Sequence, residues 1–259
     1  MPVTMPAGKN AKIALVTGGS RGMGRSTVLS LAARDVQTIF TYNSNKAEAD
    51  KVVASAALAG HRAVALQLDM GQVGSFDAFV EDLRGALDML HATRLDFLVN
   101  NAGMSLHKPF DQTSVDDLDL VFRVHFQGVF FLIQKLLPIL NDGGRIINIS
   151  SGLTRFTSPG ISAYASMKGA VEVLTRYLAK ELGPRGITVN TVAPGAIATD
   201  FSGGIVRDNP ELNRQVSAMT ALGRAGQPDD VGPMIAALLS DDNRWVNAQR
   251  IEVSGGMVI

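Results

Sequence analysis

The chain has 259 residues, 46% of them hydrophobic and 19% charged, and its 24 basic and 24 acidic residues cancel to a formal net charge of zero. This composition can build a large core and excludes a disordered chain, and charge neutrality argues against a protein held to nucleic acid by phosphate contacts. The chain has no cysteine, which excludes disulfides, thiolate nucleophiles and cysteine-based metal sites.

Short apolar runs alternate with longer helical patterns along the chain. The predicted strands are 12–17, 37–42, 63–68, 96–100, 145–150, 187–193 and 249–253. The predicted helices are 22–34, 46–58, 75–90, 114–137, 163–182 and 229–239. Such alternation indicates βαβ units, and continuous apolar strands are typical of sheets covered on both faces. We therefore expect an α/β fold, a Rossmann-like doubly wound parallel sheet of seven strands with helices on both faces.

The pattern also predicts how the chain is organised and where the protein resides. We expect one domain over residues 1–259, with a flexible N-terminus at 1–10, and a loop or lid within 195–225. The N-terminus has no apolar signal-peptide core, and the most apolar stretch, 128–140, is interrupted by polar residues and Pro138. We judge that stretch too short and too polar to span a membrane, and expect a soluble, cytoplasmic protein without a metal site.

A glycine-rich segment, TGGSRGMG at residues 17–24, separates the first predicted strand from the first predicted helix. In that context Gly18 permits a tight turn, Gly22 a close approach of the backbone to a pyrophosphate, and Gly24 close packing of the helix on the strand. The helix N-terminus then offers free N–H groups and a positive dipole to phosphate. A plain strand-to-helix turn is the alternative, because the spacing is not G-x-G-x-x-G.

The end of the second predicted strand bears on which nucleotide binds. A carboxylate there accepts hydrogen bonds from the ribose of NAD. Here the strand ends at Tyr42, Asn43 and Ser44 follow, and no carboxylate occurs before Glu48, while Arg21 lies inside the glycine loop. Hydroxyl and cationic groups suit a 2′-phosphate, so we expect NADP(H). The alternative is that these are ordinary surface residues.

Tyr164 and Lys168 lie four residues apart at the start of a predicted helix and so share one face. Ser151 follows the fifth predicted strand, at the edge where parallel sheets carry ligands. Hydride delivery to a ketone needs a positioned acid, and the reverse reaction needs a base. A nearby ammonium and a positive nicotinamide both favour the phenolate, so we expect the pKa of Tyr164 to be lowered from about 10.

From about Lys12 to Gly256, the sequence resembles the short-chain dehydrogenase/reductase family, in its single-domain form of about 250 residues. The resemblance rests on the glycine loop, Asp69 after the third strand, the NNAG motif at 100–103, Ser151 thirteen residues before the YxxxK motif, and Pro194-Gly195 followed by Thr199. It implies that Tyr164 is the acid/base, that Ser151 orients the carbonyl and that Lys168 holds the ribose. The cofactor contacts that we expect are Gly18, Ser20, Arg21, Gly22, Met23, Gly24, Tyr42, Asn43, Ser44, Asp69, Met70, Asn100, Ala102, Gly103, Tyr164, Lys168, Pro194, Gly195, Ile197 and Thr199.

His125 departs from the family pattern, because it stands where members usually carry an asparagine. In the family the backbone carbonyl of that residue holds a water in the proton relay to the lysine. A backbone role survives a change of side chain, so we expect His125 to be tolerated or to join the relay, since imidazole shuttles protons near neutral pH. The alternative is a buried, hydrogen-bonded histidine outside any relay.

The leading functional hypothesis is an NADPH-dependent carbonyl reductase for a small-molecule ketone. A 3-oxoacyl-carrier-protein reductase is the second, with Arg185 as the one cation available for an acidic carrier, and a non-catalytic NADP(H)-binding sensor or scaffold is the third. The substrate pocket should draw on Ser151, His107, Leu153, Phe156 and Phe201, whose largely apolar side chains favour an aryl or alkyl ketone. The family resemblance implies a homotetramer or homodimer, without nucleic-acid or membrane partners.

Overall fold

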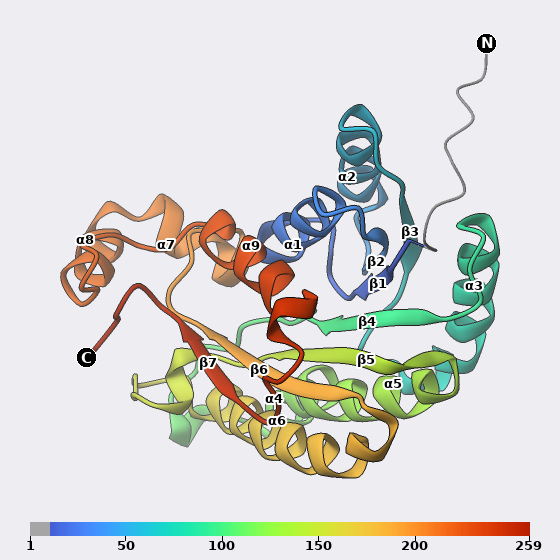
Figure 1. The fold of residues 1–259 in the computed structure, drawn as a ribbon. Helices are drawn as coiled ribbons and strands as arrows, with labels where there is room; N and C mark the ends of the chain where they lie inside the picture. Colours follow the sequence, from blue (N-terminus) through green and yellow to red (C-terminus); the bar gives the residue numbers. More distant parts are fainter. Residues whose placement is uncertain (1–10) are drawn as a thin grey trace.

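A computed structural model describes residues 11–259, in which one parallel sheet forms the centre of the molecule (Figure 1). Its strands are β1 (Ile13–Val16), β2 (Gln37–Tyr42), β3 (Ala63–Gln67), β4 (Leu95–Asn100), β5 (Leu140–Ile149), β6 (Thr188–Pro194) and β7 (Arg250–Val253). Their order across the sheet is β3-β2-β1-β4-β5-β6-β7, so the direction of progression reverses between β1 and β4. The expected doubly wound α/β fold is confirmed. The expected flexible N-terminus, 1–10, lies outside the described residues.

Helices cover both faces of the sheet (Figure 1). The α-helices are α1 (Gly22–Ala32), α2 (Lys46–Leu58), α3 (Phe76–Met89), α4 (Val115–Phe122), α5 (Gly128–Leu136), α6 (Ser162–Glu181), α7 (Ile205–Asp208), α8 (Pro210–Ala218) and α9 (Pro228–Leu238). Side chains of α1, α2 and α9 share one buried cluster, and those of α3, α5 and α6 share the other. The two clusters are the two layers of a doubly wound fold.

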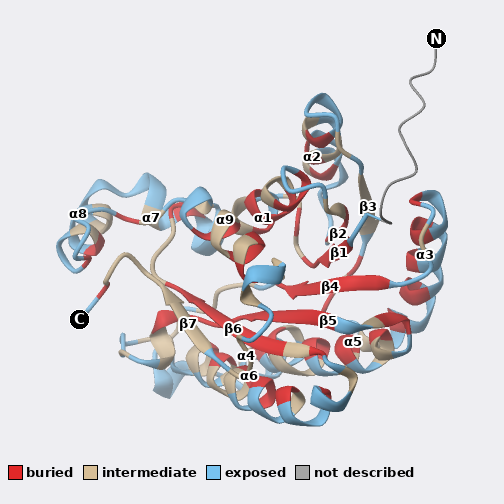
Figure 2. Ribbon diagram, viewed as in Figure 1, coloured by how far each residue is buried: buried red, intermediate tan, exposed pale blue. Residues whose placement is uncertain are grey.

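The strand residues alternate between these two clusters. On β1, Ile13 and Leu15 join the cluster under α3, α5 and α6, whereas Ala14 and Val16 join the cluster under α1, α2 and α9. Successive side chains of a strand point to opposite faces, so a sheet covered on both faces needs apolar residues at every position. Strands β1 and β4 are accordingly buried along their length, and β5 is buried over its second half (Figure 2). This rigid centre fixes where the carboxyl ends of the strands lie.

The long predicted helix over 114–137 is present, but a π-helical turn at Arg123–Gln127 divides it into α4 and α5. Gly128 follows that turn and lies directly against the backbone of Met70: a Cβ at this position would be 2.2 Å from the Met70 carbonyl oxygen. Only glycine allows so close an approach. Such π turns cluster at functional sites, and this one contains His125.

By length and composition the continuous helical run Val115–Ile139 could cross a membrane, contrary to our judgement of the shorter stretch 128–140. In the fold this run packs on the sheet, and Leu132, Ile133 and Leu136 are buried in the core. The core helix of a soluble protein passes the same test, so the run is weak evidence for a membrane segment.

The segment expected to be a loop, 195–225, contains two helices that the sequence analysis missed, α7 and α8. Asn209 caps α8, because its Oδ1 accepts hydrogen bonds from the backbone N–H groups of Glu211 and Leu212 at 3.0 and 3.1 Å. Pro210 occupies the first helical position, where its missing N–H costs nothing. Figure 1 shows both helices standing out from the body of the molecule, and Figure 2 shows that they are largely exposed.

The C-terminal tail, residues 255–259, runs beside the segment that follows α8. The backbone N–H of Val258 donates to the Met219 carbonyl at 2.9 Å, and that of Leu222 donates to the Gly255 carbonyl at 3.1 Å. The guanidinium of Arg155, in the turn after β5, donates to the carbonyls of Met257 and Val258 at 2.6 and 2.7 Å. The tail therefore ties the segment after α8 to the turn after β5.

Candidate active site

Ser151, Tyr164 and Lys168 come together at the carboxyl end of β5. Ser151 is the first residue of the turn that follows the strand, and Tyr164 and Lys168 lie in the first two turns of α6. Their exposed fractions are 9%, 8% and 5%. The Lys168 ammonium lies 5.6 Å from the centroid of the Tyr164 ring and donates to the Ile149 carbonyl at 2.8 Å. The strand and the helix thus hold three of the four predicted catalytic side chains in one buried site, and His125 is the fourth.

Burial dominates the electrostatics of this site. It raises the pKa of Tyr164 to about 12, and the hydrogen bond with the Ser151 side chain opposes that rise. Burial also lowers the pKa of Lys168 to about 8. The expected lowering of the Tyr164 pKa is therefore wrong for this structure, because desolvation of the phenolate outweighs the hydrogen bond with Ser151. At neutral pH the tyrosine is protonated and the lysine is charged.

His125 is 1% exposed and its ring meets the Tyr164 ring edge-on, with 5.1 Å between the centroids. Its Nε2 lies 2.7 Å from the Met104 carbonyl oxygen, whereas Nδ1 is buried and has no hydrogen-bond partner within residues 11–259. Burial, followed by the charge of Lys168, lowers the pKa of His125 to about 3. The imidazole is neutral and donates through Nε2, so it does not take up a proton near neutral pH.

The glycine loop is held against β4 and the segment after it. Asn101 donates through Nδ2 to the Thr17 and Gly18 carbonyls at 2.9 and 3.1 Å, and the Thr17 hydroxyl accepts from the Asn101 backbone N–H at 2.9 Å. A Cβ on Gly24 would be 2.1 Å from the Gly18 carbonyl oxygen, so α1 begins in direct contact with the loop. Arg21 precedes α1 and its side chain caps nothing. The arrangement leaves the backbone N–H groups at the start of α1 to a ligand.

The residues predicted to select NADP(H) lie at the exposed surface near the loop. Arg21, Asn43 and Ser44 are exposed and Tyr42 is half-buried. The Arg21 guanidinium is 3.9 Å from the Asp200 carboxylate, a loose, exposed ion pair.

The other predicted cofactor residues divide into three groups. Near the glycine loop, Thr199 lies against Gly22 and Ala102 lies against Gly18. Two more are turned into the fold: Asn100 is 3% exposed and donates to the Asn148 side chain on β5 at 2.8 Å, and Met70 is 4% exposed. Among the remaining residues, Pro194 is buried and Gly103 is exposed. The half-buried ones are Ser20, Met23, Asp69, Gly195 and Ile197.

Of the predicted substrate-pocket residues, Ser151 hydrogen-bonds Tyr164, and the Phe201 ring lies beside the Tyr164 ring with 6.1 Å between the centroids. The turn after β5 begins at Ser151 and contains the short 3-10 helix Gly152–Thr154; we call it the serine turn. Leu153 lies in it, and its N–H donates to Ser151 Oγ at 3.2 Å. The Phe156 ring packs on Gly152 in that turn. His107 is exposed and packs against Gly160, before α6. These side chains surround the serine turn and the start of α6.

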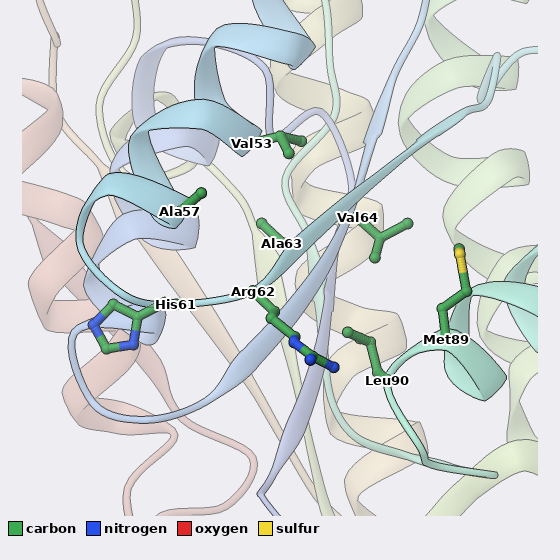
Figure 3. Close-up of a pocket in the computed structure, with 8 residues that line it drawn as sticks. All are labelled: Val53, Ala57, His61, Arg62, Ala63, Val64, Met89 and Leu90. Carbon is green, nitrogen blue, oxygen red and sulfur yellow. The ribbon is translucent and has the colours of Figure 1, made fainter. Parts of the chain in front are cut away.

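A surface pocket of about 280 Å³ lies elsewhere, where α2 leads into β3 and α3 ends (Figure 3). It is lined by Val53, Ala57, His61, Arg62, Ala63, Val64, Met89 and Leu90. Because it lies at the amino end of β3, it is on the opposite edge of the sheet from Tyr164. None of its residues was a predicted site residue.

Some residues that shape the site were missed from the sequence. Met104 provides the carbonyl that holds His125, and the Thr41 hydroxyl accepts from the Gly18 N–H at 3.1 Å. Glu172 and Arg250 pair behind the serine turn at 2.8 Å. No local pattern marks such residues, because their partners are distant in the chain.

A family model described as enoyl-(acyl carrier protein) reductase matches residues 18–258. The hydroxynaphthalene reductase-like protein Arp2 of Metarhizium brunneum is 36% identical over 265 residues, covering 98% of this chain and 97% of Arp2. The promiscuous reductase LugOII, which catalyses keto-reduction at C1 during lugdunomycin biosynthesis, has a TM-score of 0.91 at 39% identity, covering 96% of this chain and 98% of LugOII. The angucycline C-6 ketoreductase LanV with bound NADP has a TM-score of 0.90 at 36% identity, covering 95% of each chain.

Proposed function

Since this chain belongs to the short-chain dehydrogenase/reductase family, we propose that it reduces a ketone to an alcohol with NADPH, by reversible hydride transfer. The observation that carries the proposal is the buried grouping of Ser151, Tyr164 and Lys168 at the carboxyl end of β5. A protonated tyrosine at that place is suited to give a proton to a developing alkoxide.

The residues present fit NADP(H) as cofactor. Gly24 lies so close to the Gly18 carbonyl that the loop must keep its turn, and the start of α1 has no acidic residue to repel phosphate. Arg21, Asn43 and Ser44 are exposed and available to a 2′-phosphate. The solved relative LanV carries NADP, which supports the same nucleotide here. When bound, NADPH supplies the hydride that adds to the carbonyl carbon.

The chain's own residues then handle the carbonyl oxygen. The Ser151 hydroxyl donates to that oxygen and holds it beside Tyr164, whose O–H delivers the proton. The Lys168 ammonium, anchored on the Ile149 carbonyl, holds the ribose and stabilises the phenolate that proton delivery leaves. His125 holds the Met104 carbonyl, so its proposed part is to fix the helix turn beside Tyr164 rather than to carry a proton.

We propose an aryl ketone with fused rings as the substrate class. Phe201 faces the Tyr164 ring and Phe156 packs on the serine turn, and such flat apolar side chains favour flat apolar substrates. The names of similar proteins point in the same direction, because LanV is an angucycline ketoreductase and Arp2 is a hydroxynaphthalene reductase-like protein.

The carrier-protein alternative has less support. Arg185, the cation considered for docking an acidic carrier, pairs with Asp142 at 2.7 Å and donates to the carbonyls of Leu137 and Leu140 at 2.9 and 2.6 Å. Arg185 also precedes β6 and so lies at the amino edge of the sheet, away from the catalytic side chains.

The test is NADPH oxidation with a panel of fused-ring aryl ketones, small alkyl ketones and 3-oxoacyl thioesters. We expect turnover to be fastest with the aryl ketones, and Tyr164→Phe to reduce kcat by about 10³-fold because it removes the general acid. NADPH affinity, measured by fluorescence titration, should remain within about twofold. Binding of NADPH without turnover of any member would contradict the proposal and favour the sensor hypothesis. Faster turnover of the thioesters would favour the carrier-protein reductase.

A further inference from the structure

Behind the serine turn lies a group of charged side chains that the proposed reaction does not use. Glu172, on α6, pairs with Arg250, on β7: Oε1 of the carboxylate accepts from Arg250 Nε at 2.8 Å. The two side chains are only 14% and 25% exposed. A half-buried ion pair of this kind adds little net stability, since desolvation offsets the attraction. Its contacts with the turn therefore indicate another role.

The pair holds the serine turn at both ends. The same Oε1 of Glu172 accepts from Ser150 Oγ at 2.7 Å and lies 2.7 Å from Thr154 Oγ1. Thr154 Oγ1 also lies 2.9 Å from the Ser151 carbonyl oxygen, and its single proton serves one of these acceptors at a time. Glu172 therefore binds the residue before Ser151 and the residue three positions after it.

Arg250 completes this arrangement. Its Nη2 donates to the Ser151 carbonyl at 3.2 Å and to Thr154 Oγ1 at 3.1 Å, and its Nη1 donates to Glu252 at 3.0 Å. A planar guanidinium presents several donors in a fixed geometry, so it can hold the turn, Glu172 and Glu252 together. The Ser151 hydroxyl is therefore carried by a backbone segment in which Ser150, the Ser151 carbonyl and Thr154 are all held by hydrogen bonds.

We propose that Glu172 and Arg250 are positioning residues that fix the Ser151 hydroxyl for the reaction proposed above, on which this inference rests. Displacing such a hydroxyl by a fraction of an ångström weakens its transition-state contact and leaves the cofactor site untouched. The pair therefore acts on kcat through Ser151.

The variants are Glu172→Gln, Arg250→Met and the double variant, with Glu181→Gln as the matched control because Glu181 is an exposed residue at the end of the same helix. Each single variant should lower kcat by about tenfold with NADPH affinity unchanged. The double variant, which leaves no unpaired charge, should regain the wild-type Tm while kcat stays low. Recovery of kcat together with Tm would overturn the proposal, since that is the behaviour of a structural pair.

A double-mutant cycle sharpens the test. In a Ser151→Ala background, Glu172→Gln should lower kcat no further, because the group it positions is gone; full additivity would contradict the inference. Hydrogen–deuterium exchange of amides 151–156 needs no turnover and should rise about tenfold in Glu172→Gln and stay unchanged in Glu181→Gln. If the wild-type enzyme is inactive but Glu172→Gln still raises the exchange, only the proposed function is contradicted. If Glu172→Gln leaves the exchange unchanged, only the positioning role is contradicted.

Discussion

His125 makes a contact that an asparagine side chain could also make. The imidazole donates from Nε2 to the Met104 carbonyl, 2.7 Å away. An asparagine amide can donate to the same carbonyl, but a phenylalanine cannot. We expect His125→Asn to keep kcat within about threefold and His125→Phe to lower it about tenfold or more, since a buried carbonyl loses its donor. Equal activity of the two variants in steady-state assays would show that the contact with Met104 has no effect on catalysis.

The same residue makes the fold sensitive to acid. The folded-state pKa of His125 is lowered to about 3 from 6.5, so the unfolded chain binds the proton more tightly. Its contribution to stability is therefore fully present above pH 6.5 and is lost as the pH falls toward 3. Relative to His125→Asn, wild-type protein should lose about 2 kcal/mol of unfolding free energy between pH 7.5 and pH 5. Urea titrations at both pH values measure this; parallel losses in the two proteins would exclude a buried neutral imidazole.

Arg21 bears on the choice of nucleotide. Its guanidinium faces Asp200 at 3.9 Å in an exposed pair, which is worth little and is easily exchanged for a phosphate. Arg21→Gln should raise the Kd for NADPH about tenfold and that for NADH less than twofold, because only NADPH carries the 2′-phosphate. Lys46→Gln is the control, since Lys46 pairs with Asp50 at 2.7 Å. An equal loss of both nucleotides would assign Arg21 to the shared pyrophosphate instead.

At the scale of elements, Gly128 lets the helix that follows the π turn pack directly against the backbone of Met70. A Cβ on residue 128 would meet the Met70 carbonyl at 2.2 Å, whereas one on Gly85, in α3, meets nothing within 4 Å. Gly128→Ala should destabilise the protein by about 2 kcal/mol or more, through a forced backbone shift. Gly85→Ala should stabilise it by up to about 1 kcal/mol, because alanine is the better helix former. Urea unfolding of both variants decides the matter; a harmless Gly128→Ala would mean that α5 can move away from Met70.

Elements with strong local patterns were predicted well from the sequence. The bounds of β2 and α2 agree at both ends, since the polar segment 43–45 ends the strand pattern and Asn45 caps the helix. By contrast, β5 begins at Leu140 rather than at 145, because its first half continues through a polar, glycine-containing segment. Helix α8 was missed although Asn209 and Pro210 form a recognisable start, because the glycines on both sides of it are typical of a loop.

The candidate site was predictable where its residues lie close in sequence. The Tyr164–Lys168 pair follows from helical spacing, and the glycine loop from its place between a strand and a helix. The raised pKa of Tyr164 was not predictable, because it depends on the burial that the whole fold imposes. Nor was the Glu172–Arg250 pair, whose members lie 78 residues apart in the chain.

At the scale of the whole molecule, three phenylalanines form an apolar stripe on an outer helix. Phe122, Phe126 and Phe130 stack along α4, the π turn and α5, with ring centroids 5.9 and 6.2 Å apart. Phe122 and Phe130 are each 38% exposed. Such a stripe on an outer helix is typical of a surface that packs against another subunit. We propose that a second copy of the chain covers it, within a homotetramer or homodimer.

Light scattering after size exclusion tests this assembly. Wild-type protein should elute at a multiple of the 27.5 kDa chain mass, and Phe130→Glu should shift it toward a smaller species because a buried charge has no partner. Leu58→Glu, on exposed α2, should leave the mass unchanged. A monomeric wild-type protein would refute the proposed assembly.

The C-terminal tail has a practical consequence for anyone who handles this protein. Ile259 is 93% exposed, so a tag can follow it without displacing buried atoms. The carbonyls of Met257 and Val258, in contrast, are bound by Arg155, and Val258 is paired with Met219. A cleavage site placed there should keep Met257 and Val258, because removing them would release the turn after β5 and the segment after α8 from their contacts with the tail. The same tail offers a compact target for mutagenesis, since changes there act on the segment after α8 and on the turn after β5 and leave Ser151, Tyr164 and Lys168 unchanged.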